Sequence, residues 1–98
     1  MNITLEEFKK EAVPYLAESK LLQADAKRIG TTPELFAEHY LETEQIDHAS
    51  AITEAYERAL AKPEGTDLST TYGQLADLLE LMLNEQNLSD IAKRLRNA

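Results

Sequence analysis

The sequence predicts an all-α protein, folded as a compact bundle or orthogonal array of about five helices. Apolar residues recur at intervals of three and four positions, which is the period of a helix with one buried face. No segment alternates apolar and polar residues with the period of two that strands show. The composition is 43 % hydrophobic and 29 % charged, with 6 % aromatic residues and no Trp, which favours a helical globular chain.

The length of 98 residues suffices for one domain and is too short for two. We therefore expect residues 1–98 to form a single acidic helical domain. The helices are predicted at approximately residues 5–28, with a kink near Pro14, and at 33–43, 47–61, 71–84 and 88–96.

The first predicted helix begins after Thr4, because Thr4 and Glu7 have the spacing of a reciprocal capping box. Its apolar residues stay on one face of the helix before and after Pro14. An interior proline removes a backbone hydrogen bond and costs about 3 kcal/mol, so we expect one kinked helix or two helices that abut near residue 13. Gly30 ends the segment. The apolar positions are Leu5, Phe8, Ala12, Tyr15, Leu22, Ala26 and Ile29.

Two further helices are predicted in the middle of the chain. Thr32 and Pro33 form a start signal, a hydroxyl cap followed by proline in the first turn. The apolar residues of 35–41 and those of 49–60 are centred on different helical faces, so a break or strong bend is expected around residues 43–47. The stretch 62–67 has the composition of a loop.

The last two helices differ strongly in composition. Thr71 and Gln74 can form another capping box, and the leucine-rich stretch that follows is the predicted centre of the core. Asn87 is a suitable cap for a short fifth helix. Cations in its final turn complement the helix dipole; they are Lys93, Arg94 and Arg96.

The residue inventory argues against an enzyme. The chain has no Cys, which excludes disulfides, thiol nucleophiles and Cys-based metal sites. Its two histidines, His39 and His48, do not have a metal-binding helical spacing, and Glu44 and His48 are interpreted as a surface pair. We therefore predict no catalytic, cofactor-binding or metal-binding residues.

The charge distribution is uneven. The chain has 18 acidic and 10 basic residues, a formal charge of −8, and no Lys or Arg lies between Arg28 and Arg58. The glutamates at 34, 38 and 42 repeat every four residues and so share one helix face. This face is interpreted either as a docking surface for a cationic partner or as a solvated face that maintains solubility. The predicted partner-binding residues are Glu34, Glu38, Glu42, Glu44 and Asp47.

Part of the sequence resembles the helix-turn-helix signature of bacterial transcription regulators. The resemblance is carried by residues 26–36, AKRIGTTPELF, followed by Tyr40 and Leu41. In that family a small residue packs where two helices cross, a glycine four positions later makes the turn, and apolar residues of the second helix fill the wedge. Ala26, Gly30, Leu35 and Phe36 occupy these places. The resemblance implies a DNA-binding regulator that uses residues 20–43 and dimerises.

Such a regulator would take its positive charge from a few residues, namely Lys27, Arg28, Lys93, Arg94 and Arg96. DNA binding depends on cations that neutralise phosphates, whereas the polar positions of the second helix include Glu34, Glu38 and Glu42. Nucleic acid is therefore the disfavoured partner.

The leading hypothesis is a non-enzymatic protein–protein interaction module, such as an adaptor, inhibitor, immunity or phage accessory protein, that docks on a basic protein surface. The helix-turn-helix regulator is the alternative. Abundant leucines in 21–22, 78–79 and 81–83 leave a homodimer possible. No apolar run approaches the roughly 20 residues of a membrane span, and no signal peptide is evident, so a cytoplasmic protein is expected.

Overall fold

The computed structural model describes residues 1–97, which form six α-helices and, within this range, no strand. The predicted all-α class is confirmed, although the number of helices is six. The radius of gyration is 13.2 Å, and the molecule measures 40 × 23 × 23 Å along its principal axes. The helices are α1 (Leu5–Ala17), α2 (Lys20–Arg28), α3 (Pro33–Leu41), α4 (Ile46–Leu60), α5 (Ser69–Met82) and α6 (Glu85–Arg96).

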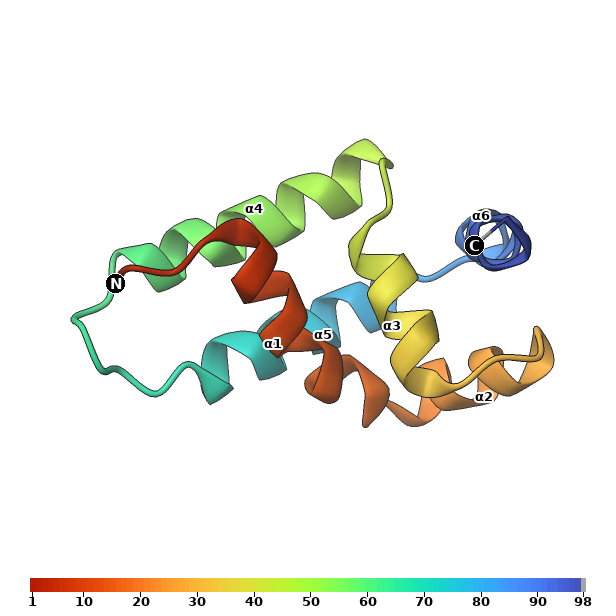
Figure 1. The fold of residues 1–98 in the computed structure, drawn as a ribbon, viewed down its shortest axis with the longest axis horizontal. Coiled ribbons are helices and arrows are strands. Elements are labelled where there is room, and N and C mark those ends of the chain that lie inside the picture. Colours follow the sequence, from red (N-terminus) through yellow and green to blue (C-terminus); the bar gives the residue numbers. More distant parts are fainter. Residues whose placement is uncertain (98) are drawn as a thin grey trace.

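The helices form an array in which long and short elements cross. α4 and α5 lie side by side along the long axis, and α6 is seen almost end-on at the far end of the molecule (Figure 1). α1 packs on both α3 and α5, while α2 and α6 rest mainly on α3. This arrangement places α1 and α3 next to each other, although about fifteen residues of chain separate them.

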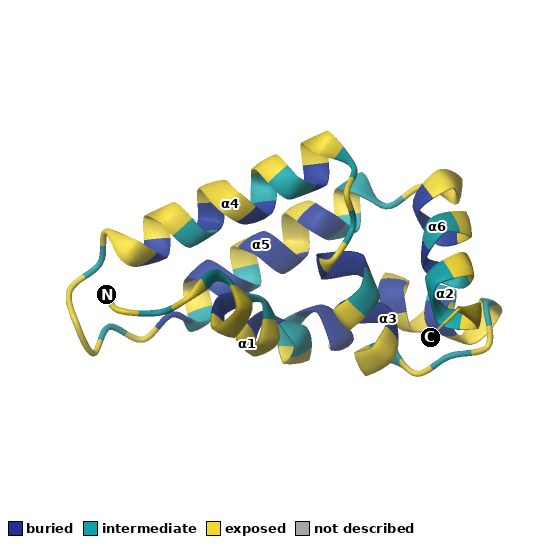
Figure 2. Ribbon diagram, turned by 45° about the horizontal axis from the view of Figure 1, so that its top comes forward, coloured by how far each residue is buried: buried dark blue, intermediate teal, exposed yellow. Residues whose placement is uncertain are grey.

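The core lies between the inner faces of α1, α3, α4 and α5, as the buried residues in Figure 2 show. Its largest side chains come from five helices, and α3 contributes more of them than α5 does. Leu75 and Leu79 of α5 are buried as expected, but Leu78 is 42 % exposed and does not belong to the core. The largest fully buried apolar side chains are Phe8, Leu16, Leu22, Phe36, Tyr40, Leu41, Leu75, Leu79 and Ile91.

The predicted helix over residues 5–28 is two helices, and the break does not lie at Pro14. α1 begins at the predicted capping box, in which the Glu7 amide donates to Thr4 Oγ1 (3.1 Å), and it continues through Pro14 to Ala17. The chain turns instead at Ser19, which has an extended backbone and caps α2 by accepting from the Leu22 amide (3.3 Å). The Ser19 hydroxyl also donates to Glu80 of α5 (2.6 Å). A capping serine, rather than the proline, therefore ends the first helix.

The turns around α3 follow the sequence signals closely. Gly30 has φ +84°, the left-handed conformation that glycine adopts most readily after a helix. Thr32 Oγ1 accepts from the Leu35 amide (3.2 Å), and Pro33 is the first helical residue. α3 ends at Leu41, two residues before its predicted end, and the predicted break near 43–47 is the loop before α4.

The starts of α5 and α6 differ from the predicted ones. α5 begins at Ser69, so Thr71 lies inside the helix and is buried; the Asp67 carboxylate, not a Thr71 box, accepts from the Ser69 amide (3.0 Å). α6 begins at Glu85 with Asn84 as its cap. Asn87 is the third helical residue, and its Oδ1 accepts a hydrogen bond from the Asn84 amide (2.9 Å). Both helices therefore start two or three residues before their predicted first residues.

Candidate functional site

A groove of about 760 Å³ lies between α1 and α3. Apolar side chains of both helices line it: Val13 and Pro14 from α1, and Leu41 from α3. Carboxylates line it as well. They are Glu6 and Glu7 from α1 and Glu34, Glu38 and Glu42 from α3 and its C-cap.

The acidic side of this groove follows directly from helix geometry. Residues four apart lie on one helix face, so Glu34, Glu38 and Glu42 follow one another along α3. The opposite face carries Phe36 and Tyr40, which are fully buried. Burial of these aromatic rings fixes the rotation of α3 and turns the three glutamates toward the groove.

Cations from other helices lie beside the glutamates of α3, which has no Lys or Arg of its own. Lys9 Nζ lies 3.6 Å from Glu42 Oε2, and Lys10 and Arg94 also line the groove. The groove therefore holds five carboxylates and three cations, and it is only moderately negative. Within residues 1–97, Glu34 and Glu38 are exposed and take part in no ion pair.

The remaining two predicted partner-binding residues lie elsewhere. Glu44 lines a second hollow of about 490 Å³ between the α3–α4 loop and α6, together with Lys93 and Arg94. Asp47 stands in the first turn of α4, where a carboxylate stabilises the helix dipole, and it lines neither hollow. The structure thus brings together three of the five predicted residues.

A buried polar cluster was not predicted from the sequence. His48 is 3 % exposed, and its Nε2 lies 3.1 Å from the hydroxyl of Tyr40, which in turn donates to the Leu79 carbonyl (2.7 Å). The interpretation of Glu44 and His48 as a surface pair is wrong, because α4 begins at Ile46 and His48 points inward. Burial raises the pKa of Tyr40 well above its ordinary value.

A network of amides holds α6 against the α3–α4 loop. Asn87 is 1 % exposed and donates to Gln45 Oε1 (2.6 Å), while Gln45 donates to Asp90 (3.0 Å). At the other side, Arg28 of α2 donates to both carboxylate oxygens of Glu85 (3.0 and 3.1 Å). These contacts fix the position of α6. Arg94, in the last turn of this helix, is thereby held beside the groove.

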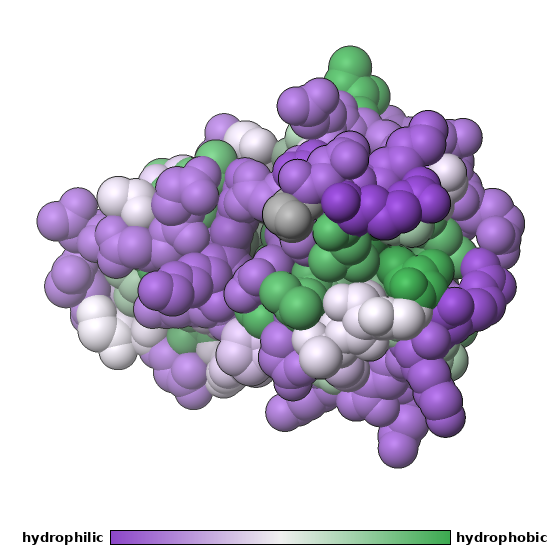
Figure 3. All heavy atoms as spheres, turned by 45° about the vertical axis from the view of Figure 1, so that its right-hand side comes forward, coloured by the Kyte–Doolittle hydropathy of each residue, from purple (hydrophilic) through white to green (hydrophobic). Residues whose placement is uncertain are grey.

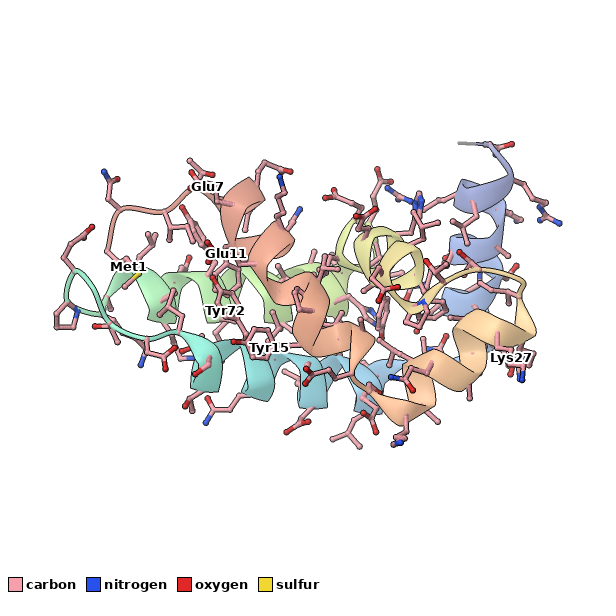
Figure 4. All side chains as sticks on the ribbon, turned by 60° about the horizontal axis from the view of Figure 1, so that its bottom comes forward. Met1, Glu7, Glu11, Tyr15, Lys27 and Tyr72 are labelled. Atoms are coloured by element: carbon pink, nitrogen blue, oxygen red, sulfur yellow. The ribbon has the colours of Figure 1, made fainter. Side chains whose placement is uncertain are left out.

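The segment that resembles a helix-turn-helix forms two helices joined at Gly30. Ala26 and Phe36 are fully buried, as the resemblance implies, but Leu35 is 44 % exposed and fills the wedge only in part. The outer face of α3 carries the glutamates of the groove. α3 itself contains no Lys or Arg, and Lys27, which Figure 4 labels on α2, does not line the groove.

Several large apolar side chains are exposed. Leu81 of α5 is 84 % and Ile46 of α4 is 80 % exposed, and Leu21, Leu35, Leu60 and Leu78 are 36 to 47 % exposed. On the face that includes α2, α3 and α6, apolar atoms gather in a central area that hydrophilic residues surround (Figure 3). A homodimer through such surfaces stays a prediction.

Neither a metal centre nor a membrane span is found among residues 1–97. No three His, Asp or Glu side chains in this range are arranged to hold a metal ion. No helix in the described part of the chain is long and apolar enough to cross a membrane.

No model of a protein family matches the chain, and neither curated proteins nor solved structures show a significant similarity to it.

Proposed function

We propose that this protein is a non-enzymatic interaction module that docks a cationic segment of another protein in the groove between α1 and α3. The observation that carries the proposal is the position of Glu34 and Glu38. Both are exposed and without an ion pair within residues 1–97, and both border a groove with apolar lining. The binding residues are Glu34 and Glu38, with Glu6 and Glu7 across the groove.

The energetics support a function rather than stability as the reason for this arrangement. Glutamates at i and i+4 repel each other by about 0.2 to 0.5 kcal/mol, so helix stability does not favour Glu34 beside Glu38. A basic segment would relieve that repulsion. Long-range attraction would also accelerate its association, while Val13 and Leu41 offer apolar surface for it to bury.

The proposed mechanism is occlusion. While its cationic segment is bound in the groove, the partner cannot use that segment to bind another macromolecule. The protein would then be an adaptor, inhibitor, immunity or phage accessory protein, and a cytoplasmic location remains our expectation. The buried Ala26 and Phe36 agree with the helix-turn-helix resemblance, but the exposed glutamates of α3 oppose the DNA-binding alternative.

The test measures binding of a deca-lysine peptide at low salt by isothermal titration calorimetry. The variant Glu34→Lys/Glu38→Lys reverses two charges in the groove. Glu57→Lys/Glu64→Lys is its matched control, because both residues are exposed and neither lines the groove. Both variants change the net charge equally. We expect the groove variant to bind at least tenfold more weakly than the control, about 1.4 kcal/mol.

Equal weakening by the two variants would mean that the peptide senses net charge alone, and this result would refute the proposal. Circular dichroism melts of both variants show whether each remains folded. A gel-shift series with DNA fragments at low salt provides the second arm, and specific retention of DNA would favour the helix-turn-helix regulator instead.

A further inference from the structure

A second hollow, of about 620 Å³, lies between α1, the N-terminal segment and the start of α5. It is distinct from the acidic groove, although Glu7 and Pro14 border both. Figure 4 shows that Glu11 and Tyr72 point toward each other and that Tyr15 lies beside Tyr72, with Met1 farther along the same side. Aromatic rings and carboxylates therefore line one hollow.

Two tyrosines line this hollow, and one of them offers its ring to a ligand. The rings of Tyr15 and Tyr72 are stacked, with centroids 5.3 Å apart and an interplanar angle of 27°. Tyr72 is 4 % exposed, because it also packs on the ring of Phe8 (4.9 Å between centroids), and it donates its hydroxyl to Glu11 Oε2 (2.6 Å). The half-buried ring of Tyr15 is therefore the aromatic surface open to a ligand, and Tyr72 holds it in place.

The hollow has negative charge without a compensating side chain. Glu7, Glu11 and Asp67 line it, and no Lys, Arg or His does so among the described residues. The ammonium group of Met1 is directed elsewhere, since it donates to the carbonyls of Leu60 (2.8 Å) and Lys62 (3.0 Å).

The three carboxylates are not equally available to a ligand. Asp67 binds the amide and hydroxyl of Ser69, and these hydrogen bonds lower its pKa, so it stays ionised. Glu7 accepts from Thr4 in the capping box. Glu11 uses only Oε2, for Tyr72, and its Oε1 accepts no hydrogen bond from residues 1–97. Glu7 likewise keeps Oε2 free of such a bond, but Glu11 lies four residues from Tyr15 on α1 and is therefore the carboxylate placed beside the open aromatic ring.

We propose that this hollow binds the guanidinium group of an arginine side chain from a partner protein. A guanidinium is planar, stacks on aromatic faces and donates to carboxylates, so the ring of Tyr15 and the carboxylate of Glu11, four residues apart on α1, match its chemistry. An ammonium group is more strongly hydrated and gains less from an aromatic face. The inference does not depend on the groove between α1 and α3, whose residues Glu34 and Glu38 lie outside this hollow.

The experiment titrates the ¹⁵N-labelled protein with N-acetyl-arginine amide and follows its amide resonances by NMR. N-acetyl-citrulline amide is the control ligand, because it has the same shape without the charge. Saturable shifts are expected at Glu11, Tyr15, Asp67 and Tyr72 with the arginine compound and not with the citrulline compound. N-acetyl-lysine amide should bind at least threefold more weakly.

Two variants assign the site. Glu11→Gln keeps an acceptor for the Tyr72 hydroxyl and removes the charge, while Glu57→Gln removes an equal charge from an exposed position of α4. We expect Glu11→Gln to weaken arginine binding at least fivefold and Glu57→Gln to leave it unchanged. Tyr15→Leu should also weaken it, because it removes the ring on which the guanidinium stacks.

Equal affinities of the Glu11→Gln and Glu57→Gln proteins would overturn the inference. So would equal affinities for the arginine and lysine compounds, or the absence of shifts in this hollow. Shifts confined to Glu34 and Glu38 would overturn it too and would support the proposed function of the groove. The two proposals can therefore fail separately.

Discussion

The hydroxyl oxygen of Tyr40 lies 3.1 Å from Nε2 of His48, and both side chains are buried. The hydroxyl has one proton, which it donates to the Leu79 carbonyl (2.7 Å), so its oxygen must accept the proton of His48 Nε2. Nε2 of the imidazole therefore carries a proton. Its Nδ1 has no hydrogen-bond partner among the described residues. The pair links α3 and α4 to the carboxyl end of α5.

The first prediction concerns this link. The carbonyl of Leu79 is one of the last four of α5, which lack a partner in the helix, so Tyr40 satisfies a group that would otherwise be buried and unpaired. Tyr40→Phe removes the hydroxyl from both neighbours. It should lower the free energy of unfolding by about 1 to 3 kcal/mol, as measured by urea denaturation at neutral pH.

Tyr72→Phe is the comparison for this measurement. Its hydroxyl donates to Glu11, which is exposed and can turn to water when the hydroxyl is absent. The expected loss is therefore smaller, about 0.5 to 1.5 kcal/mol. If Tyr40→Phe costs no more than Tyr72→Phe, the buried cluster does not stabilise the fold in the way that we describe.

The second prediction is a loss of stability at alkaline pH. A tyrosine in the unfolded chain ionises near pH 10, whereas burial raises the pKa of Tyr40 in the folded protein. Above about pH 10 the unfolded chain releases a proton that the folded chain keeps. The free energy of unfolding contributed by Tyr40 is thus fully present below that pH and decreases above it, by up to about 1.4 kcal/mol per pH unit.

Urea denaturation at several alkaline pH values would measure this decrease. Burial and the hydrogen bond to Glu11 also raise the pKa of Tyr72, so the wild-type protein should show the sum of both effects. Tyr40→Phe should make the dependence on pH less steep, whatever its stability at neutral pH. Parallel curves for the two proteins would show that Tyr40 ionises equally in the folded and unfolded chains.

The helical fold was predictable because its signals are local. The capping box of Thr4 and the Thr32–Pro33 start lie within a few residues of the helices they begin, and both are confirmed. The break at Ser19 was not predicted. The hydrogen bond from Ser19 to Glu80 (2.6 Å) joins positions that are distant in sequence, so the spacing of residues along the chain could not predict it.

The candidate site was predictable only in part. Periodicity places Glu34, Glu38 and Glu42 on one face of α3, and all three line the groove. It does not reveal what faces them, and so the pairing of Glu42 with Lys9 (3.6 Å) was not foreseen. The tyrosine hollow was missed for the same reason, because Tyr15 and Tyr72 come from α1 and α5 and meet only in the fold.

The third prediction compares two glycines whose backbones differ. Gly73 lies within α5, has no positive φ, and a Cβ built there would meet no atom within 4 Å. Gly73→Ala should therefore raise the free energy of unfolding by about 0.5 to 1 kcal/mol, because alanine has fewer conformations in the unfolded chain.

Gly30 has equal space around it but φ +84°, a conformation that an L-residue adopts with strain. Gly30→Ala should lower the free energy of unfolding by about 1 kcal/mol. Thermal melts of both single variants give opposite shifts of Tm if this reasoning holds. Shifts of the same sign would contradict the assignment of the turn between α2 and α3.

The fourth prediction concerns Arg94, the cation that α6 brings to the groove. Arg94 takes part in no ion pair within residues 1–97, so it opposes the approach of a basic segment without stabilising the fold by such a pair. Arg94→Gln keeps most of the side chain and removes its charge. At roughly 6 Å in a solvent-exposed site, one unit charge contributes about 0.7 kcal/mol.

The Arg94→Gln protein should therefore bind deca-lysine about threefold more tightly than the wild-type protein at low salt. Arg96→Gln is the matched control, since Arg96 lies on the same helix, is exposed and does not line the groove. Both changes make the net charge equally more negative. A gain limited to Arg94→Gln places the peptide beside α6 in the groove, whereas equal gains would mean that the peptide binds to the protein's overall charge.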